Sequence, residues 1–234
     1  MSPFISEFVG TSILLLLGNG VVANVVLSKT KGNGSGWIVI TLGWAMAVFV
    51  GVYASAAASG AHLNPAVTIG LAVKTNDWSN VPLYIAAQML GAMFGSLLVW
   101  LSYRQHFDET ENKDLKLAVF CTAPAIRNTV NNFISEVIGT FMLMMGVLFL
   151  SSPENKLGSL DALPVALLVL AVGLSLGGST GYAINPARDL GPRLLHFILP
   201  IKNKRDSDWG YSWIPVVAPI TGAVIAVIVF GLIK

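Results

Sequence analysis

The sequence predicts an all-α membrane protein with six transmembrane helices and two re-entrant half-helices, arranged as an inverted repeat. Three observations support this prediction: the composition, the lengths of the apolar segments, and a similarity between the two halves of the chain. Hydrophobic residues make up 54% of the chain, charged residues only 11%, and the mean hydropathy is +0.71. So few charges cannot cover the surface of a water-soluble domain. We therefore expect a multi-pass protein of the cell membrane, surrounded by the lipid bilayer.

Six segments have about the length that a membrane-spanning helix needs, which is roughly 20 residues for a hydrocarbon core of about 30 Å. The first is too long for a signal-peptide core and has no basic region before it, so we expect it to remain as a span. Residues 104–117 are rich in charges and are expected to form a solvated loop without a site. The six segments are 4–27, 37–57, 82–103, 130–151, 162–179 and 212–233.

Two further apolar segments, His62 to Lys74 and Asn185 to His196, are long enough to cross only about half of the membrane. Irregular backbone at membrane depth persists only where protein encloses it or where it lines a wet cavity. Two such half-helices therefore indicate a polar feature inside the protein.

The two halves of the chain resemble each other at three places. Each half, 1–117 and 118–234, holds three spans and one half-helix within one integral domain. Because three is odd, the second copy enters the membrane from the opposite face, and the two copies are inverted. The half-helices can then meet at the midplane from opposite sides. The matching pairs are ISExxGT at 5–11 and 134–140, GAHLNPA at 60–66 and GYAINPA at 181–187, and Gly-Ala at 91–92 and 222–223.

Each half-helix begins with an Asn-Pro-Ala turn. Asparagine is a favoured helix N-cap, and proline suits the first helical position. If the cap holds the asparagine oxygen, the amide nitrogen is free to donate into the space between the half-helices. Each helix N-terminus adds roughly +0.5 of an elementary charge, so the midplane should repel cations and protons. One such turn is typical of an ordinary cap, whereas two in inverted halves indicate a pore. The two turns are Asn64, Pro65, Ala66 and Asn185, Pro186, Ala187.

The paired turns, the two ISExxGT anchors, SGAH at 59–62 and Arg188-Asp189 resemble the aquaporin (major intrinsic protein) family over nearly the whole chain. The resemblance implies six tilted helices around two half-helices, one pore per subunit, and a homotetramer with cytoplasmic termini. Arg188 matches the family arginine of the outer constriction, where it would repel cations and donate hydrogen bonds to solutes. The alternative for Arg188 is a surface arginine in a loop.

Three further residues, Trp44, Gly173 and Tyr182, resemble with Arg188 the constriction of the glycerol facilitator (aquaglyceroporin) branch. Its glycine leaves room where water-selective relatives usually place histidine, and two aromatic faces suit the carbon backbone of a polyol. That branch more often has phenylalanine at the Tyr182 position, and the extra hydroxyl would narrow the opening or add a polar contact. Trp44 has an alternative role at the lipid interface. Further positions that resemble the glycerol branch are Asp189, Arg193, Pro215 and Val216.

Two carboxylates, Glu7 and Glu136, fall within predicted spans, where a proton relay is the default hypothesis. The resemblance instead implies that each accepts hydrogen bonds from backbone N–H groups leading into a half-helix, so we predict structural roles. Asp189 is also assigned a structural role. His62 is expected with equal weight to line the inner vestibule or to be a packing residue.

These patterns together predict a passive channel for small uncharged solutes, chiefly glycerol and water, that excludes ions and protons and catalyses no reaction. Dihydroxyacetone, urea and undissociated lactic acid are further candidate solutes. A water-selective aquaporin is the nearest alternative. A secondary transporter is the second, since that class also uses inverted repeats and broken helices.

Cofactors, metals and nucleic acid are not expected as partners. The single cysteine, Cys121, excludes an intramolecular disulfide, and Cys, His and carboxylate residues do not cluster at a metal-ligand spacing. The net charge of +2 is too small to indicate nucleic-acid binding. Basic residues also give no clear orientation: with a cytoplasmic N-terminus, the inner side would hold only Lys74, Lys156 and Lys234, contrary to the positive-inside rule.

Overall fold

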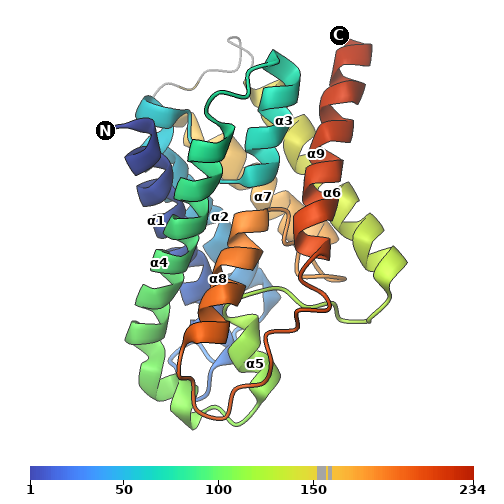
Figure 1. The fold of residues 1–234 in the computed structure, drawn as a ribbon. Coiled ribbons are helices and arrows are strands. Elements are labelled where there is room, and N and C mark those ends of the chain that lie inside the picture. Colours follow the sequence, from blue (N-terminus) through green and yellow to red (C-terminus); the bar gives the residue numbers. More distant parts are fainter. Residues whose placement is uncertain (152–156, 158–159) are drawn as a thin grey trace.

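The computed structural model describes residues 1–151, 157 and 160–234, and Lys156 therefore lies outside the described residues. The described residues form nine α-helices (Figure 1). Their bounds are α1 Pro3–Val26, α2 Trp37–Ser59, α3 Pro65–Thr75, α4 Val81–Glu109, α5 Lys113–Ala118, α6 Thr129–Leu150, α7 Ala162–Leu176, α8 Pro186–Ile198 and α9 Ile214–Ile233.

Helices α1, α2, α4, α6 and α9 are long and apolar enough to cross a membrane. The fifth predicted span, 162–179, is shorter than expected, because α7 has 15 residues and covers about 22 Å. Gly177 and Gly178 follow its last residue, and consecutive glycines disfavour continuation of a helix. In contrast, α4 continues six residues past the predicted end of its span. Its last turns are polar but rich in helix-forming residues, so apolarity underestimated the length of the helix.

Residues 104–117 are mostly helical and not a loop, although their charged side chains are exposed as predicted. These exposed residues are Arg104, Asp108, Glu109, Glu111, Lys113 and Asp114. The first part belongs to α4, and the last part forms α5, which begins after the N-cap Asn112. Lys116 on α5 is only 1% exposed, and its ammonium donates a hydrogen bond to the Lys202 carbonyl at 2.6 Å. The predicted boundary at residue 117 falls inside α5, so this helix connects the two repeats.

Lys204 also has a structural role on this side of the molecule. Its ammonium donates to the carbonyls of His196, Phe197 and Leu199 at 2.5–2.8 Å, where α8 ends. A cation at a helix C-terminus satisfies carbonyls that lack intrahelical partners. Basic residues on the face opposite the termini thus include groups that the fold itself requires.

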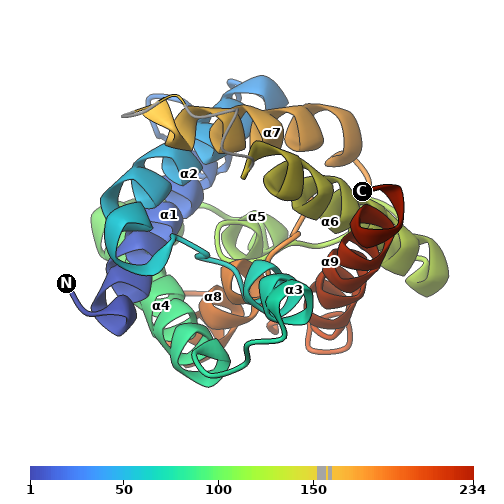
Figure 2. The ribbon, with the colours of Figure 1, turned by 90° about the horizontal axis from the view of Figure 1, so that it is seen from above.

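The helices pack in the manner of an inverted repeat. Helix α1 packs against α2 and α4, and in the other half α6 packs against α7 and α9. Both termini lie at one end of the bundle, α3 descends from that end, and α8 lies toward the opposite end (Figure 1). Each half-helix packs mainly on the last long helix of the other half, α3 on α9 and α8 on α4 (Figure 2). The two repeats are therefore interlocked.

Glycines allow the closest of these helix contacts. A Cβ added to Gly95 of α4 would lie 2.3 Å from the Ser12 carbonyl oxygen of α1. The same holds in the second half, where a Cβ on Gly222 of α9 would lie 2.4 Å from the Val137 carbonyl oxygen of α6. Small residues at such crossings let two backbones approach closely within a membrane.

We expect Gly95→Ala to destabilise the protein by about 1–3 kcal/mol, because the added methyl group meets backbone atoms that cannot rotate away. Thermal unfolding in detergent would measure the effect. Gly231→Ala is the matched control, since a Cβ there meets nothing within 4 Å. Equal unfolding temperatures for the two variants would contradict the close-contact interpretation.

Candidate functional site

The two half-helices begin with the asparagine caps that the sequence predicted. The Asn64 side-chain oxygen accepts a hydrogen bond from the Ala66 amide at 2.9 Å. The Asn185 oxygen accepts from the amides of Ala187 at 3.0 Å and Arg188 at 3.2 Å. Both cap residues have extended backbone, as an N-cap requires.

The residues before each cap are not helical. The first half-helix was expected from His62, but α3 begins at Pro65, and α8 begins at Pro186. Positive φ angles at Gly60, Ala61 and Leu63 interrupt the backbone, and an equivalent set occurs in the second half at Gly181, Tyr182 and Ile184. Non-glycine residues in this conformation cost of order 1–3 kcal/mol each, so surrounding contacts must hold them in place.

The two asparagines join the two halves at the midplane. The Asn64 amide nitrogen donates to the Ile184 carbonyl at 2.9 Å, and the Asn185 amide nitrogen donates to the Leu63 carbonyl at 2.8 Å. A carboxamide nitrogen carries two hydrogens. One hydrogen of each asparagine is therefore bound to the opposite half, and only the second remains for a solute.

Glu7 holds the backbone that leads into α3. It is fully buried, and its two oxygens accept from the backbone amides of His62 at 2.9 Å and Leu63 at 2.7 Å. The Ser59 hydroxyl and the Gln88 amide donate to the same carboxylate, at 2.6 and 2.8 Å. These four donors use both oxygens of Glu7, so the side chain serves as a scaffold for the strained segment.

Glu136 has the equivalent position in the second half. It is 1% exposed and accepts from the backbone amides of Ala183 and Ile184, both at 2.9 Å. The Thr180 hydroxyl adds a third hydrogen bond at 2.6 Å. The two carboxylates thus hold the two carbonyls that accept from the asparagines.

A ring of three side chains encloses the outer end of the site. The Arg188 guanidinium lies 4.2 Å from the centre of the Trp44 ring and donates to the Phe120 carbonyl at 3.3 Å. Trp44 is 5% exposed and Arg188 is 7% exposed. Burial at these positions excludes the two alternatives, a lipid-facing tryptophan and a surface arginine. Tyr182, also buried, completes the ring.

A cavity of about 390 Å³ extends from this ring past the N-termini of both half-helices. It passes Asn64 and Asn185 and ends near Ser151 and Asp161, which lie at the end of α6 and the start of α7. Most of its wall is apolar. The apolar part includes Val48, Val52, Leu71, Leu143, Val147 and Val169, from both halves of the chain.

His62 combines the two roles that the sequence left open. Its ring lines the cavity, and it also packs edge-on against Tyr84 with 4.9 Å between ring centres. Its Nδ1 lies 3.2 Å from the Thr68 hydroxyl. The histidine is therefore both a satisfied packing residue and part of the wall.

Gly173 lies behind the ring and not in the wall of the cavity. A Cβ added to Gly173 would lie 2.9 Å from Tyr182 Cζ. The room that this glycine was expected to leave for a solute is therefore filled by the Tyr182 side chain.

Asp189 anchors the segment that presents the Phe120 carbonyl to Arg188. Its Oδ2 accepts from the Thr122 amide at 2.8 Å and from the Thr122 hydroxyl at 2.7 Å. Its Oδ1 accepts from Arg193 Nε at 2.8 Å, and both side chains are fully buried. A buried ion pair needs such additional hydrogen bonds to offset desolvation.

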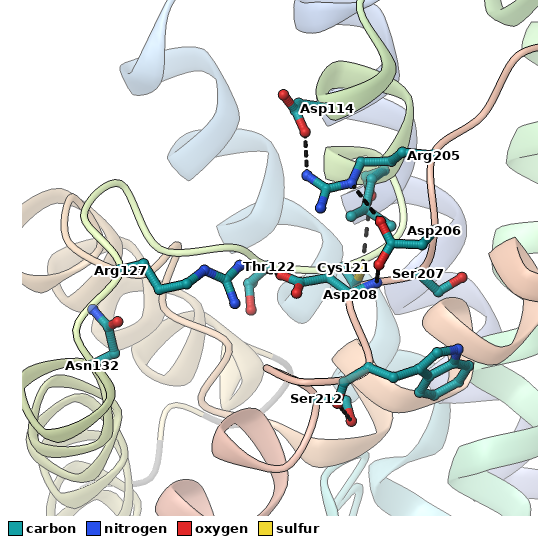
Figure 3. Close-up of polar contacts among 12 residues, drawn as sticks. Asp114, Cys121, Thr122, Arg127, Asn132, Arg205, Asp206, Ser207, Asp208 and Ser212 are labelled. Carbon is teal, nitrogen blue, oxygen red and sulfur yellow. Dashed lines mark hydrogen bonds and ion pairs between the residues drawn. The ribbon is translucent and has the colours of Figure 1, made fainter.

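Arg193 extends this anchor to the loop between α8 and α9. It donates to the carbonyls of Thr122 at 2.9 Å, Ser207 at 2.7 Å and Asp208 at 3.2 Å. Farther out, Arg127 pairs with Asp208 (Figure 3). The outer loops are thus tied to each other and to the half-helix that carries Arg188.

The sequence matches the major intrinsic protein family over residues 1–230. The chain belongs to this family. A probable glycerol uptake facilitator protein of Thermotoga maritima is 58% identical over 96% of each chain. The glycerol uptake facilitator protein of Streptococcus pneumoniae is 56% identical over 99% of each chain. Among solved structures, the aquaglyceroporin from Plasmodium falciparum is 36% identical, with a TM-score of 0.86 over 97% of this chain and 93% of that chain.

These similarities establish the aquaporin fold for this member of the major intrinsic protein family. The chain is a multi-pass integral protein of the cell membrane, as its composition predicted. The family consists of channels and transporters and is not a class of enzymes.

Sequence reasoning missed several residues that position the site. Gln88 donates to Glu7 and to the Thr68 hydroxyl, the latter at 2.9 Å. A glutamine inside an apolar span was a usable signal, since polar side chains there need a reason. Phe120 and Thr122 act mainly through backbone atoms, and their residue types carry no such signal.

We expect Glu7→Gln to lower the free energy of unfolding by about 3 kcal/mol, because an amide replaces one acceptor oxygen and faces other donors. Thermal unfolding in detergent would measure the loss, with the exposed Glu111→Gln as the control. Proton conductance, followed with a pH-sensitive dye inside vesicles, should not rise. Normal folding together with a proton leak would contradict the scaffold role.

Proposed function

We propose that this protein is a passive channel for small uncharged solutes, chiefly glycerol, together with water. The single observation that carries the proposal is the 390 Å³ cavity, which runs from the ring of Trp44, Tyr182 and Arg188 past both asparagines. A largely apolar passage with a few polar groups along it suits a molecule that has both carbon and hydroxyl faces.

Glycerol fits the chemistry of the ring. Trp44 and Tyr182 offer apolar surface to the carbon backbone, and Arg188 offers hydrogen-bond donors to the hydroxyls. At the midplane, the second amide hydrogens of Asn64 and Asn185 continue the series of donors. The similar proteins named above, which are glycerol uptake facilitators and an aquaglyceroporin, favour the same class of solute.

Ions and protons are excluded by two effects. The fixed guanidinium of Arg188 and the N-termini of α3 and α8 make the passage electropositive, which repels cations. The apolar wall cannot replace the hydration shell of an ion of either sign. We propose that no coupling ion and no chemical reaction takes part.

Two alternatives remain as outcomes of the test. A water-selective channel would have a ring too narrow for glycerol. A secondary transporter would couple flux to an ion or proton gradient, but the ionisable groups Glu7 and Glu136 are both occupied by structural hydrogen bonds.

We further propose a homotetramer with one pore per subunit, on the basis of the family resemblance. Each subunit lines its own cavity with residues from both of its halves, so permeation requires no residue from a neighbour.

Purified protein in liposomes should show glycerol permeability well above that of protein-free vesicles, with larger polyols slower. Stopped-flow light scattering after an osmotic step would measure both glycerol and water. The glycerol flux should stay proportional to the glycerol concentration and should not change when a proton gradient is imposed. Water flux without glycerol flux would leave the water-selective alternative, and saturation at low concentration would favour the transporter.

Lactic acid should enter the same vesicles in its undissociated form only, because the apolar wall disfavours the anion. Uptake at a fixed total concentration should therefore fall as the pH rises and the neutral fraction decreases. Radiolabelled uptake at two pH values would measure this, with glycerol as the control whose flux is independent of pH. Equal lactate uptake at both values would contradict exclusion of anions.

A further inference from the structure

The Tyr182 ring rests in a recess on α7 that two glycines create. A Cβ on Gly173 would lie 2.9 Å from Tyr182 Cζ, and a Cβ on Gly177 would lie 2.4 Å from Tyr182 Cδ1. The ring therefore covers the last turn of α7 and its C-cap, Gly177, and occupies the volume of both missing side chains. The position of the Tyr182 ring is therefore determined by the backbone at Gly173 and Gly177, which cannot move aside as a flexible side chain would.

Trp37, at the start of α2, closes this recess from the outer side. Its ring meets the Tyr182 ring edge-on, with 5.8 Å between centres and an angle of 80°. Its Nε1 donates a hydrogen bond to the Gly173 carbonyl at 3.1 Å. The same indole lies against Gly177, where a Cβ would be 2.8 Å from Trp37 Cζ2. Trp37 thus contacts every part of the recess and holds α2 to α7 at this level.

The Tyr182 hydroxyl is not what fixes the ring. Its oxygen is enclosed and has no hydrogen-bond partner among the residues that the structure describes. A buried hydroxyl without a partner destabilises a protein, so it cannot supply the force that orients the side chain. Shape complementarity with the glycines and Trp37 supplies it.

We propose that Trp37, Gly173 and Gly177 are positioning residues that seat Tyr182 and thereby set the width of the outer ring. The inference rests on the proposed glycerol conduction and names the residues that control its selectivity. The opposite side of the ring is built similarly, since Trp44 packs on Gly18 of α1, where a Cβ would lie 2.2 Å from Trp44 Cζ3. Tyr182 differs in that its support includes a second aromatic residue that can be altered separately.

The seat has a directional consequence. A methyl group at Gly177 displaces the Tyr182 ring toward Trp44 and Arg188, because α7 blocks the other direction. The opening then narrows more for a polyol than for water. A smaller ring at position 37 leaves space behind Tyr182, which lets the ring retreat and widens the opening.

The test compares Gly177→Ala, Trp37→Phe and the double variant in liposomes by stopped-flow light scattering, with water, glycerol and a four-carbon polyol as solutes. Gly177→Ala should lower the glycerol-to-water permeability ratio by about tenfold, a discrimination typical of one carbon atom in a tight site. Trp37→Phe should raise the ratio of the four-carbon polyol to glycerol. The double variant should return the glycerol-to-water ratio toward that of the native protein, because the space left by Trp37 accepts the displaced ring.

Two matched controls separate the seat from general effects. Gly178→Ala adds the same methyl group one residue later, where a Cβ meets nothing within 4 Å. Trp209→Phe alters a tryptophan that is 39% exposed, as Trp37 is, and that also meets an aromatic ring edge-on at 5.8 Å, but away from the site. Both controls should retain native ratios.

Three results would each overturn the proposal. The first is an unchanged glycerol-to-water ratio in Gly177→Ala, and the second is a double variant with the same glycerol-to-water ratio as Gly177→Ala. The third is a rise in the ratio of the four-carbon polyol to glycerol in Trp209→Phe that equals the rise in Trp37→Phe. If Gly177→Ala does not assemble, Trp37→Phe compared with Trp209→Phe decides the question. Absence of glycerol flux in the native protein would refute the proposed glycerol conduction but not the proposed positioning of Tyr182. Water permeability, reduced in Gly177→Ala and recovered in the double variant, would still test the seat.

Discussion

Two reciprocal hydrogen bonds at the midplane hold the architecture together. Asn64 and Asn185 each cap a half-helix and donate to the backbone of the opposite half. Neither bond can form unless the accepting carbonyls are turned toward the centre by a strained backbone. Glu7 and Glu136 stabilise that backbone from behind by accepting hydrogen bonds from its amides. The asparagine caps, the strained backbone before them and the buried carboxylates therefore act together. They let two helix N-termini face each other within a membrane.

The outer ring depends on different supports. Arg188 lies in the first turn of α8, between the Trp44 ring and the Phe120 carbonyl. Asp189 fixes the segment that carries this carbonyl, through Thr122. The ring is thus assembled from a half-helix, a span and an outer loop, each held by its own buried contacts. The ring still shares one anchor with the midplane, because the Arg188 backbone amide donates to the Asn185 cap.

Glycine has distinct uses in this protein. Gly95 and Gly222 bring long helices into backbone contact, which determines how closely the bundle packs. Gly173 and Gly177 receive an aromatic side chain, which determines where one wall of the ring lies. All four positions hold glycine. Whether the glycine faces another backbone or an aromatic side chain decides whether it serves helix packing or the selectivity of the ring.

Long apolar runs, two half-length segments and paired Asn-Pro-Ala turns were sufficient to predict the fold, because these features are local and repeat within the chain. Residue types marked Glu7, Glu136 and Arg188 as charges at membrane depth, which require a partner or a polar cavity, and the family resemblance supplied the roles predicted for them. Only the tertiary structure placed Gly173 behind Tyr182, gave Trp37 its contacts, and assigned one amide hydrogen of each asparagine to the opposite half. These relations join residues more than a hundred positions apart in the case of Trp37 and both asparagines. No spacing along the chain encodes such contacts, which arise only when the two inverted halves interlock.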